Sequence, residues 1–237
     1  MTSTTRKTST ISLIIPCLND QEALGKTLSH LQGEEGIEVI VADGGSHDSS
    51  RKIAETAGAH VVDSPPGRGR QLNQGAAAAG GDILFFLHAD TIPPAGFATL
   101  IRASLSDKGV AAGSFSLALD MDGRRARLVC LGTNLRSRLF SLPYGDQGFF
   151  ISREIFNKIN GFPEQELMED YEFIRRAGKL GRIKILPEAV TSSARRWRRL
   201  GFLKTTLLNQ MMVLGYLLGV SPASLARRYR RSLRSGD

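Results

Sequence analysis

Short apolar runs rich in β-branched residues alternate with stretches of helical periodicity in the part of the chain before residue 90. Each run has the length and composition of a buried strand, and a polar loop and a helical pattern follow it. The runs are Ile11 to Ile15, Ile37 to Ala42, His60 to Val62 and Ile83 to Leu87. Strands that alternate with helices in this way indicate a parallel sheet with helices on both faces. We therefore expect an α/β fold whose ligands bind at the carboxyl ends of the strands.

Beyond Pro93 the spacing of the apolar residues changes, and longer elements are predicted. They are a helix to about Leu105, a strand from Val110 to Leu119, a basic amphipathic helix from about Arg124 to Leu139, a segment at residues 144–151, a helix from Glu169 and a strand from Ile183 to Leu186. This pattern ends near Trp197. We expect one domain over residues 1–197 and a helical C-terminal extension over residues 198–237.

Composition is consistent with one domain, because 237 residues with 41% hydrophobic content can bury a single sizeable core. The two cysteines, Cys17 and Cys130, lie far apart and outside any CxxC pattern, so neither a disulfide framework nor a thiolate metal site is expected. Pro16 interrupts the first apolar run before it reaches the length of a secretory signal. These features predict a cytoplasmic protein.

His88 and Asp90 lie two residues apart at the end of an apolar run, so both side chains point to the same side of an extended chain. They could share a divalent cation whose other ligands are the oxygens of a diphosphate. The alternative is that they are two solvated polar residues at the end of a strand.

Other polar residues follow predicted strands or begin predicted helices. Asp43 precedes two glycines and could accept hydrogen bonds from a nucleobase or a ribose, or only complete a turn. Arg68 lies on a glycine-containing loop and could bind phosphate or remain on the surface. Glu169 and Asp170 open a helix, where they could complement the helix dipole or provide a general base for a hydroxyl group.

With these residues in place, the chain resembles the family 2 glycosyltransferases of the GT-A type over about residues 11–197. The resemblance rests on five segments, which are ISLIIPCLND, EVIVADGGSHDSS, GRGRQLNQGAAAAGGDILFFLHADT, YGDQGFFISRE and GFPEQELMEDYEFIRRAG. The LHADT segment is similar to that of a bacterial subfamily labelled arsenosugar-biosynthesis-associated. The resemblance implies a Rossmann-like mixed sheet flanked by helices, and a transferase that moves a sugar from a nucleotide-diphosphate donor to an acceptor hydroxyl.

The resemblance also implies roles for individual residues. Residues 11–92 would form the nucleotide-sugar half, and residues 93–197 the acceptor half. Asp170 would be the catalytic base of an inverting reaction. The nucleotide-sugar ligands would be Pro16, Asp20, Asp43, Arg68 and Asp90, the metal ligands Asp90 and His88, and the acceptor-side residues Gln147, Glu169, Arg196 and Trp197.

Three positions depart from the usual pattern of the family. The resemblance implies a divalent metal cofactor, Mn²⁺ or Mg²⁺. His88 stands at the first position of what is commonly an Asp-x-Asp motif, which predicts either weaker metal binding or a lean toward Mn²⁺, because Mn²⁺ accepts an imidazole nitrogen more readily than Mg²⁺ does. Leu18 stands where many relatives have a tyrosine that stacks on the base, so the identity of the nucleotide stays open. Residues 193–197 resemble the QxxRW motif of processive synthases, with Ser193 in place of Gln. We therefore expect transfer of a single sugar.

Two other classes of protein are alternatives to a transferase. A sugar-nucleotide nucleotidyltransferase would have a glycine-rich, basic phosphate loop after the first strand, whereas residues 16–20 read Pro-Cys-Leu-Asn-Asp. A membrane-associated basic binding module without catalysis would account for the C-terminal extension but would leave His88, Asp90 and Asp170 without a role.

The net charge of +8 comes from the C-terminal part of the chain, because residues 195–237 contain nine arginines and one lysine against one aspartate. Between Leu200 and Val220 apolar residues recur at helical spacing, but Lys204, Asn209 and Gln210 interrupt them. We expect this helix either to contact the inner face of an anionic membrane or to be buried in the fold or a homodimer. No nucleic-acid partner is expected.

Overall fold

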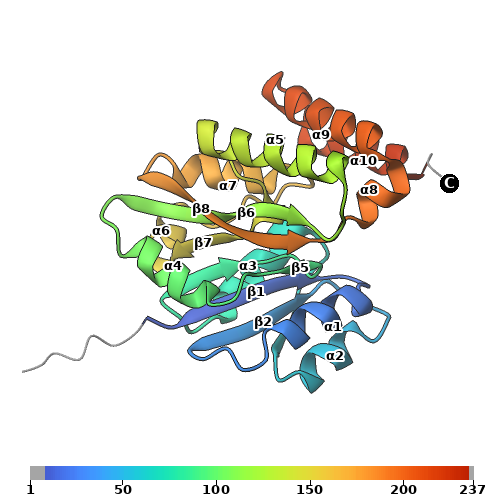
Figure 1. Ribbon diagram of the computed structural model, residues 1–237. Coiled ribbons are helices and arrows are strands. Elements are labelled where there is room, and N and C mark those ends of the chain that lie inside the picture. The colour runs from blue at the N-terminus through green and yellow to red at the C-terminus, as the bar shows by residue number, and fades with distance from the viewer. Residues whose placement is uncertain (1–8, 235–237) are drawn as a thin grey trace, which may run out of the picture.

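The computed structural model describes residues 9–234, which form an eight-stranded mixed sheet covered by helices (Figure 1). The strands are β1 (Ile11–Cys17), β2 (Ile37–Asp43), β3 (His60–Asp63), β4 (Ile83–Phe86), β5 (Thr91–Ile92), β6 (Val110–Leu119), β7 (Phe149–Ser152) and β8 (Arg182–Ser192). Their order across the sheet is β3-β2-β1-β4-β7-β6-β8-β5. Strands β7 and β5 run antiparallel to their neighbours, and every other pair is parallel. The expected mixed α/β sheet flanked by helices is confirmed.

The central strand β1 is apolar on both faces because helices cover both sides of the sheet. On one side, Leu13 and Ile15 pack against α1 (Gln21–His30), α2 (Ser50–Thr56) and α4 (Phe97–Leu105). On the other side, Ile14 packs in a second cluster with α3 (Arg68–Ala78), α6 (Arg153–Lys158) and α7 (Glu169–Ala177). The alternation of side chains along the strand therefore places adjacent residues in two separate cores.

The remaining helices lie at the opposite end of the molecule from α1 and α2 (Figure 1). They are α5 (Arg124–Phe140), α8 (Arg195–Leu200), α9 (Phe202–Leu217) and α10 (Pro222–Arg234). Leu208 and Met212 of α9 pack against Leu225 of α10 in a third small cluster. Within residues 9–234, no helix is long and apolar enough to cross a membrane.

Strand β8 is longer than expected, because it continues past Leu186 to Ser192. The register of β8 against β6 shifts between the pairs Ser114–Ile185 and Ser116–Ala189, so β8 has extra residues around Pro187 at this point. A proline cannot donate a ladder hydrogen bond, and bulges are where strands tolerate it. The bulge carries the strand onward and brings Ser193 to Asp90, whose carbonyl accepts a hydrogen bond from the Ser193 amide at 3.0 Å.

Candidate active site

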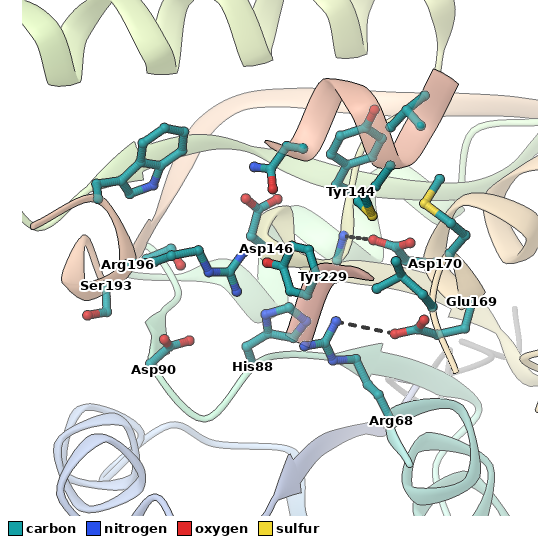
Figure 2. Close-up of a pocket in the computed structure, with 18 of the residues that line it drawn as sticks. Arg68, His88, Asp90, Tyr144, Asp146, Glu169, Asp170, Ser193, Arg196 and Tyr229 are labelled. Atoms are coloured by element: carbon teal, nitrogen blue, oxygen red, sulfur yellow. Dashed lines mark hydrogen bonds and ion pairs between the residues drawn. The ribbon is translucent and has the colours of Figure 1, made fainter. Parts of the chain in front are cut away.

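Two adjoining cavities lie at the carboxyl ends of the parallel strands. The larger, about 850 Å³, has walls from the loop after β1 and the start of α3, and we call it the α3 cavity. The smaller, about 230 Å³, is walled partly by α9, and we call it the α9 cavity. Side chains that line both cavities are Arg68, His88, Asp90, Leu167, Glu169, Arg195, Arg196 and Tyr229. The two spaces therefore share one wall that is made mostly of charged and polar groups. Figure 2 shows several of these groups around one pocket, among them His88, Asp90 and Arg68.

His88 and Asp90 lie on this shared wall, in the short segment between β4 and β5. The hydroxyl of Thr27 donates a hydrogen bond to the Ala89 carbonyl at 2.7 Å, which fixes the segment against α1. Burial lowers the pKa of His88 well below its usual value, and the nearby cations of Arg68 and Arg196 lower it further. The imidazole is therefore neutral at pH 7, which is the form that can bind a metal ion.

Arg195, at the start of α8, connects the shared wall to the loop after β1. Its Nη1 donates to Oδ1 of Asp20 at 2.6 Å, and its Nη2 lies 3.2 Å from Oδ2 of Asp90. Burial raises the pKa of Asp90, and the charge of Arg195 acts in the opposite direction. One guanidinium thus holds together two of the carboxylates that the sequence predicted as ligands of the nucleotide sugar.

Asp170 faces the α9 cavity from the first turn of α7. Its Oδ2 accepts a hydrogen bond from the Gly145 amide at 2.9 Å (Figure 2). A Cβ atom at residue 145 would lie 2.9 Å from Nε2 of His88 and 3.4 Å from Oδ2 of Asp170, so only glycine fits without displacing one of them. The turn at Gly145 therefore brings His88 and Asp170 close to the same point.

Glu169 is 3% exposed and forms an ion pair with Arg68, with 3.2 Å between Oε1 and Nη1. Burial raises the pKa of Glu169, while the Arg68 charge opposes that rise. The buried carboxylate holds the guanidinium on the wall between the cavities, where an anionic ligand in either one could reach it.

The structure brings together most of the predicted site residues. Pro16 and Asp20 line the α3 cavity, and Trp197 lines the α9 cavity. Two predicted residues line neither cavity. Asp43 is 4% exposed and accepts a hydrogen bond from the Ser46 amide at 3.1 Å.

Gln147 is the second residue away from the cavity walls, and it is fully buried. Its amide nitrogen donates to the Phe115 carbonyl at 3.0 Å, and its oxygen accepts from the Ser137 hydroxyl at 2.7 Å. These contacts anchor the 3₁₀ turn η1 (Gly145–Gln147) between β6 and α5.

Asp146 lines the α9 cavity and was not among the residues predicted from the sequence. Its Oδ1 atom is buried and has no hydrogen-bond partner among the residues that the structure describes. Burial raises the pKa of Asp146, and the charge of Arg136 partly offsets this. The sequence carried one signal for this residue, because an aspartate three residues before the apolar run Phe149–Ser152 is close to a core and needs a partner.

Other residues of the cavity walls were not predicted from the sequence, because they come from distant parts of the chain. Asn209, Met212 and Val213 of α9 line the α9 cavity, and Tyr229 of α10 lines both cavities. The C-terminal helices thus form part of the site.

The shared wall offers two side chains that could bind a divalent cation. Residues 9–234 contain no group of three or more His, Cys, Asp or Glu side chains arranged to hold a metal ion. A neutral imidazole and a carboxylate on one wall nevertheless fit an ion that takes its remaining ligands from phosphate oxygens and water. His88 and Asp90 are the residues that would hold it.

The mixed sheet, with its polar residues gathered at the carboxyl ends of the strands, defines a protein with a GT-A-like fold. The chain belongs to glycosyl transferase family 2, whose family model matches residues 12–159.

Glucosyl-3-phosphoglycerate synthase from Mycolicibacterium smegmatis is 37% identical over 97 residues, which cover 36% of this chain and 32% of that protein. The chain thus matches about a third of the length of this relative.

Two solved structures share the fold. A mannosyltransferase from Pyrobaculum calidifontis in complex with GDP-Man and Mn²⁺ has a TM-score of 0.67 at 18% identity, covering 95% of this chain and 70% of that one. Glucosyl-3-phosphoglycerate synthase from Mycobacterium tuberculosis, in complex with Mn²⁺, UDP and glucosyl-3-phosphoglycerate, has a TM-score of 0.61 at 24% identity, covering 84% and 79%.

Proposed function

We propose that this protein transfers one sugar from a nucleoside-diphosphate donor to an acceptor hydroxyl, with inversion at the anomeric carbon. One observation carries the proposal: the Gly145 turn places Asp170, a carboxylate facing the α9 cavity, close to His88 on the wall shared with the larger α3 cavity. The donor would occupy the α3 cavity and the acceptor the α9 cavity.

Five side chains of the two cavities have a task in this reaction. Asp170 accepts the proton of the acceptor hydroxyl, and the Gly145 amide holds its carboxylate in place. Arg68, held by Glu169, binds the diphosphate. His88 and Asp90 would hold a divalent cation, Mn²⁺ in preference to Mg²⁺. When bound, that cation would neutralise the charge of the departing diphosphate.

Single transfer and the subfamily are proposals of the same kind. The segment Leu87 to Thr91 reads LHADT, which supports placement with the subfamily labelled arsenosugar-biosynthesis-associated. Ser193 in place of the glutamine of QxxRW supports transfer of one sugar per acceptor.

Donor binding can be tested without knowing the acceptor. We expect thermal unfolding in the presence of UDP, GDP, CDP or dTDP to show a higher Tm for at least one nucleotide, and a larger shift with Mn²⁺, since a ligand that binds only the folded state stabilises it. A ligand at 100 times its Kd contributes about 2.7 kcal/mol to stability. If no nucleotide changes Tm with or without metal, the proposed donor site is wrong.

Asp170→Asn tests the catalytic base. The asparagine oxygen can still accept the Gly145 hydrogen bond, so the fold and nucleotide binding should survive while transfer falls about 10²–10⁴-fold. Asp122→Asn, at an exposed position, is the matched control. Transfer at the wild-type rate, or a product that NMR shows with the anomeric configuration of the donor, would exclude the assignment.

The metal ligands are tested by a pair of substitutions. Asp90→Asn should nearly abolish transfer, because it removes the only carboxylate among the two donors. His88→Asp should retain transfer and shift the preference from Mn²⁺ toward Mg²⁺, since Mg²⁺ prefers oxygen ligands. Titration of Mn²⁺ and Mg²⁺ in a transfer assay measures both effects, and full activity of the wild type in excess chelator would contradict the metal role.

A further inference from the structure

Helix α5 exposes one continuous apolar stripe. Leu128, Leu131, Leu135 and Leu139 follow each other at spacings of three and four residues, and each is between 53% and 67% exposed. Such spacing places side chains on one face of a helix. The buried residues of α5, Ala126 and Ser137, lie on other faces of the helix.

Helix α9 exposes a second stripe of the same kind. Leu203, Leu207, Met211, Leu214 and Leu218 again follow at intervals of three or four residues, with exposures from 48% to 85%. The opposite side of α9 is also apolar and is buried against α10. A helix that is apolar all round is normally buried on every side, so the exposed half of α9 lacks a partner among the described residues.

Helices α5 and α9, which carry the two stripes, lie at the same end of the molecule, away from α1 and α2 (Figure 1). We call the two stripes together the α5–α9 face. Exposed apolar side chains scattered singly need no explanation, but an exposed apolar row on each of two helices at one end of a molecule marks an interaction surface.

The helices that carry and adjoin the α5–α9 face have an excess of positive charge. Helix α5 contains five arginines and no acidic residue. Residues 195–234, which include α8, α9 and α10, contain nine arginines and one lysine and no acidic residue. Arg195 and Arg196 line the cavities, and two more pair with acidic residues, Arg198 with Asp120 and Arg230 with Glu166, which leaves a net positive charge around the face. Apolar stripes bordered by cations are typical of helices that lie in the headgroup region of a bilayer.

We propose that the α5–α9 face docks onto an anionic lipid surface, with the leucine stripes in the interface and the arginines against the headgroups. A second copy of the chain fits this face poorly, because a two-fold interface would bring two arginine-rich surfaces together. No described helix is long enough to span a membrane, so the contact is peripheral. This inference is independent of the proposed transfer reaction.

The test is cosedimentation of the full chain with vesicles of phosphatidylglycerol and phosphatidylcholine, or of phosphatidylcholine alone. We expect binding to the anionic vesicles at 0.05 M salt, little binding to the neutral vesicles, and loss of binding at 1 M salt, where screening shortens the Debye length to about 3 Å. Absence of binding to anionic vesicles at low salt would overturn the proposal.

Substitutions locate the contact. Leu131→Ser with Leu135→Ser on α5, and Leu207→Ser with Met211→Ser on α9, should each weaken vesicle binding at least about tenfold. Charge reversal at Arg124, Arg125 and Arg127 to Glu should weaken it by about 100-fold or more, since each arginine near an anionic surface contributes a factor of about five.

Leu180→Ser is the matched control, because Leu180 is 51% exposed but lies between α7 and β8, outside the α5–α9 face. All substituted positions are exposed, so the variants should keep the wild-type Tm. Equal binding by the face variants and the Leu180 control would overturn the proposal. So would dissociation of a wild-type dimer by the face variants without any change in vesicle binding, because the face would then join two copies.

Discussion

At the scale of single residues, the wall of the α9 cavity contains a buried carboxylate oxygen that has no hydrogen-bond partner in residues 9–234. This oxygen is Oδ1 of Asp146. Burial raises the pKa of Asp146, and the carboxylates of Asp170 and Asp90 raise it further. The cations of Arg136 and Arg196 lower that pKa. A buried polar group without a partner costs about 1–3 kcal/mol. Such a cost is commonly retained at functional sites, where a ligand completes the hydrogen bonds.

We expect Asp146→Asn to raise stability at pH 7 to 8 by about 1 kcal/mol, because the neutral amide avoids burying a charge. Burial raises the pKa of Asp146 in the folded state, so the protonated form favours folding below the unfolded pKa, and that benefit is lost as pH rises through the folded pKa. The advantage of the variant should therefore disappear in acid.

Urea unfolding of wild type and variant from pH 4 to pH 8 measures the Asp146→Asn effect, with Asp122→Asn as the exposed control. A stability difference that is the same at every pH would show that the charge of Asp146 is not the cause.

At the scale of elements, α3 lies against β1 at a point where only glycine fits. A Cβ atom on Gly75 would lie 2.4 Å from Cγ2 of Ile14, and Ile14 is fully buried in the second core cluster. The close contact matters for the site because α3 begins at Arg68. The helix can hold Arg68 at the shared wall only while it remains seated on β1.

Gly75→Ala should destabilise the protein by about 1–3 kcal/mol, the usual cost of overpacking a core. Gly132→Ala provides the matched control, since Gly132 also lies within a helix but has no atom within 4 Å of an added Cβ. Alanine at position 132 reduces the conformational entropy of the unfolded chain, so Gly132→Ala should stabilise the protein by about 0.4–1 kcal/mol. Chemical denaturation measures the change in the free energy of unfolding for each variant, which should be a loss for Gly75→Ala and a gain for Gly132→Ala. Equal changes in the two variants would contradict the close packing of α3.

At the scale of the whole molecule, the C-terminal helices belong to the cavity walls as well as to the surface. Tyr216 of α9 contacts the ring of Tyr171 of α7 at 5.6 Å between centroids. Asn209 and Met212 line the α9 cavity. The division into a domain of residues 1–197 and an extension of residues 198–237 remains a prediction, and it can be tested by truncation.

Removal of residues 202–237 should lower Tm and abolish transfer, because it uncovers Tyr171 and opens one wall of the α9 cavity. Asn209→Ala separates a role in the site from a role in folding, since the side chain lines the cavity without belonging to the apolar cluster. For this variant we expect a raised KM for the acceptor and an unchanged nucleotide-induced Tm shift. A truncated chain with full activity would show that the extension is separable.

The succession of strands and helices along the chain could be predicted from the sequence, because local periodicity determines it. The edge of the sheet at which the cavities lie could also be predicted, because the geometry of βα units determines it. His88, Asp90 and Asp170 could be singled out for the same reason, since each lies beside an element boundary. The sequence predicted strand β8 only as far as Leu186, because the bulge at Pro187 that lets the strand continue depends on the pairing of β8 with β6.

Which of the predicted residues meet was decided only by the tertiary structure. The contact of Arg195 with Asp20 joins residues 175 positions apart, and the approach of Gly145 to His88 depends on how a turn packs against a distant strand end. Long-range packing also placed Gln147 inside the fold and α9 over the cavity. The sequence by itself determined the elements and the chemistry of their ends, because those follow from neighbours along the chain. The shared wall, the buried Oδ1 of Asp146 and the exposure of the apolar rows on α5 and α9 depend on how distant segments pack, which no local pattern specifies.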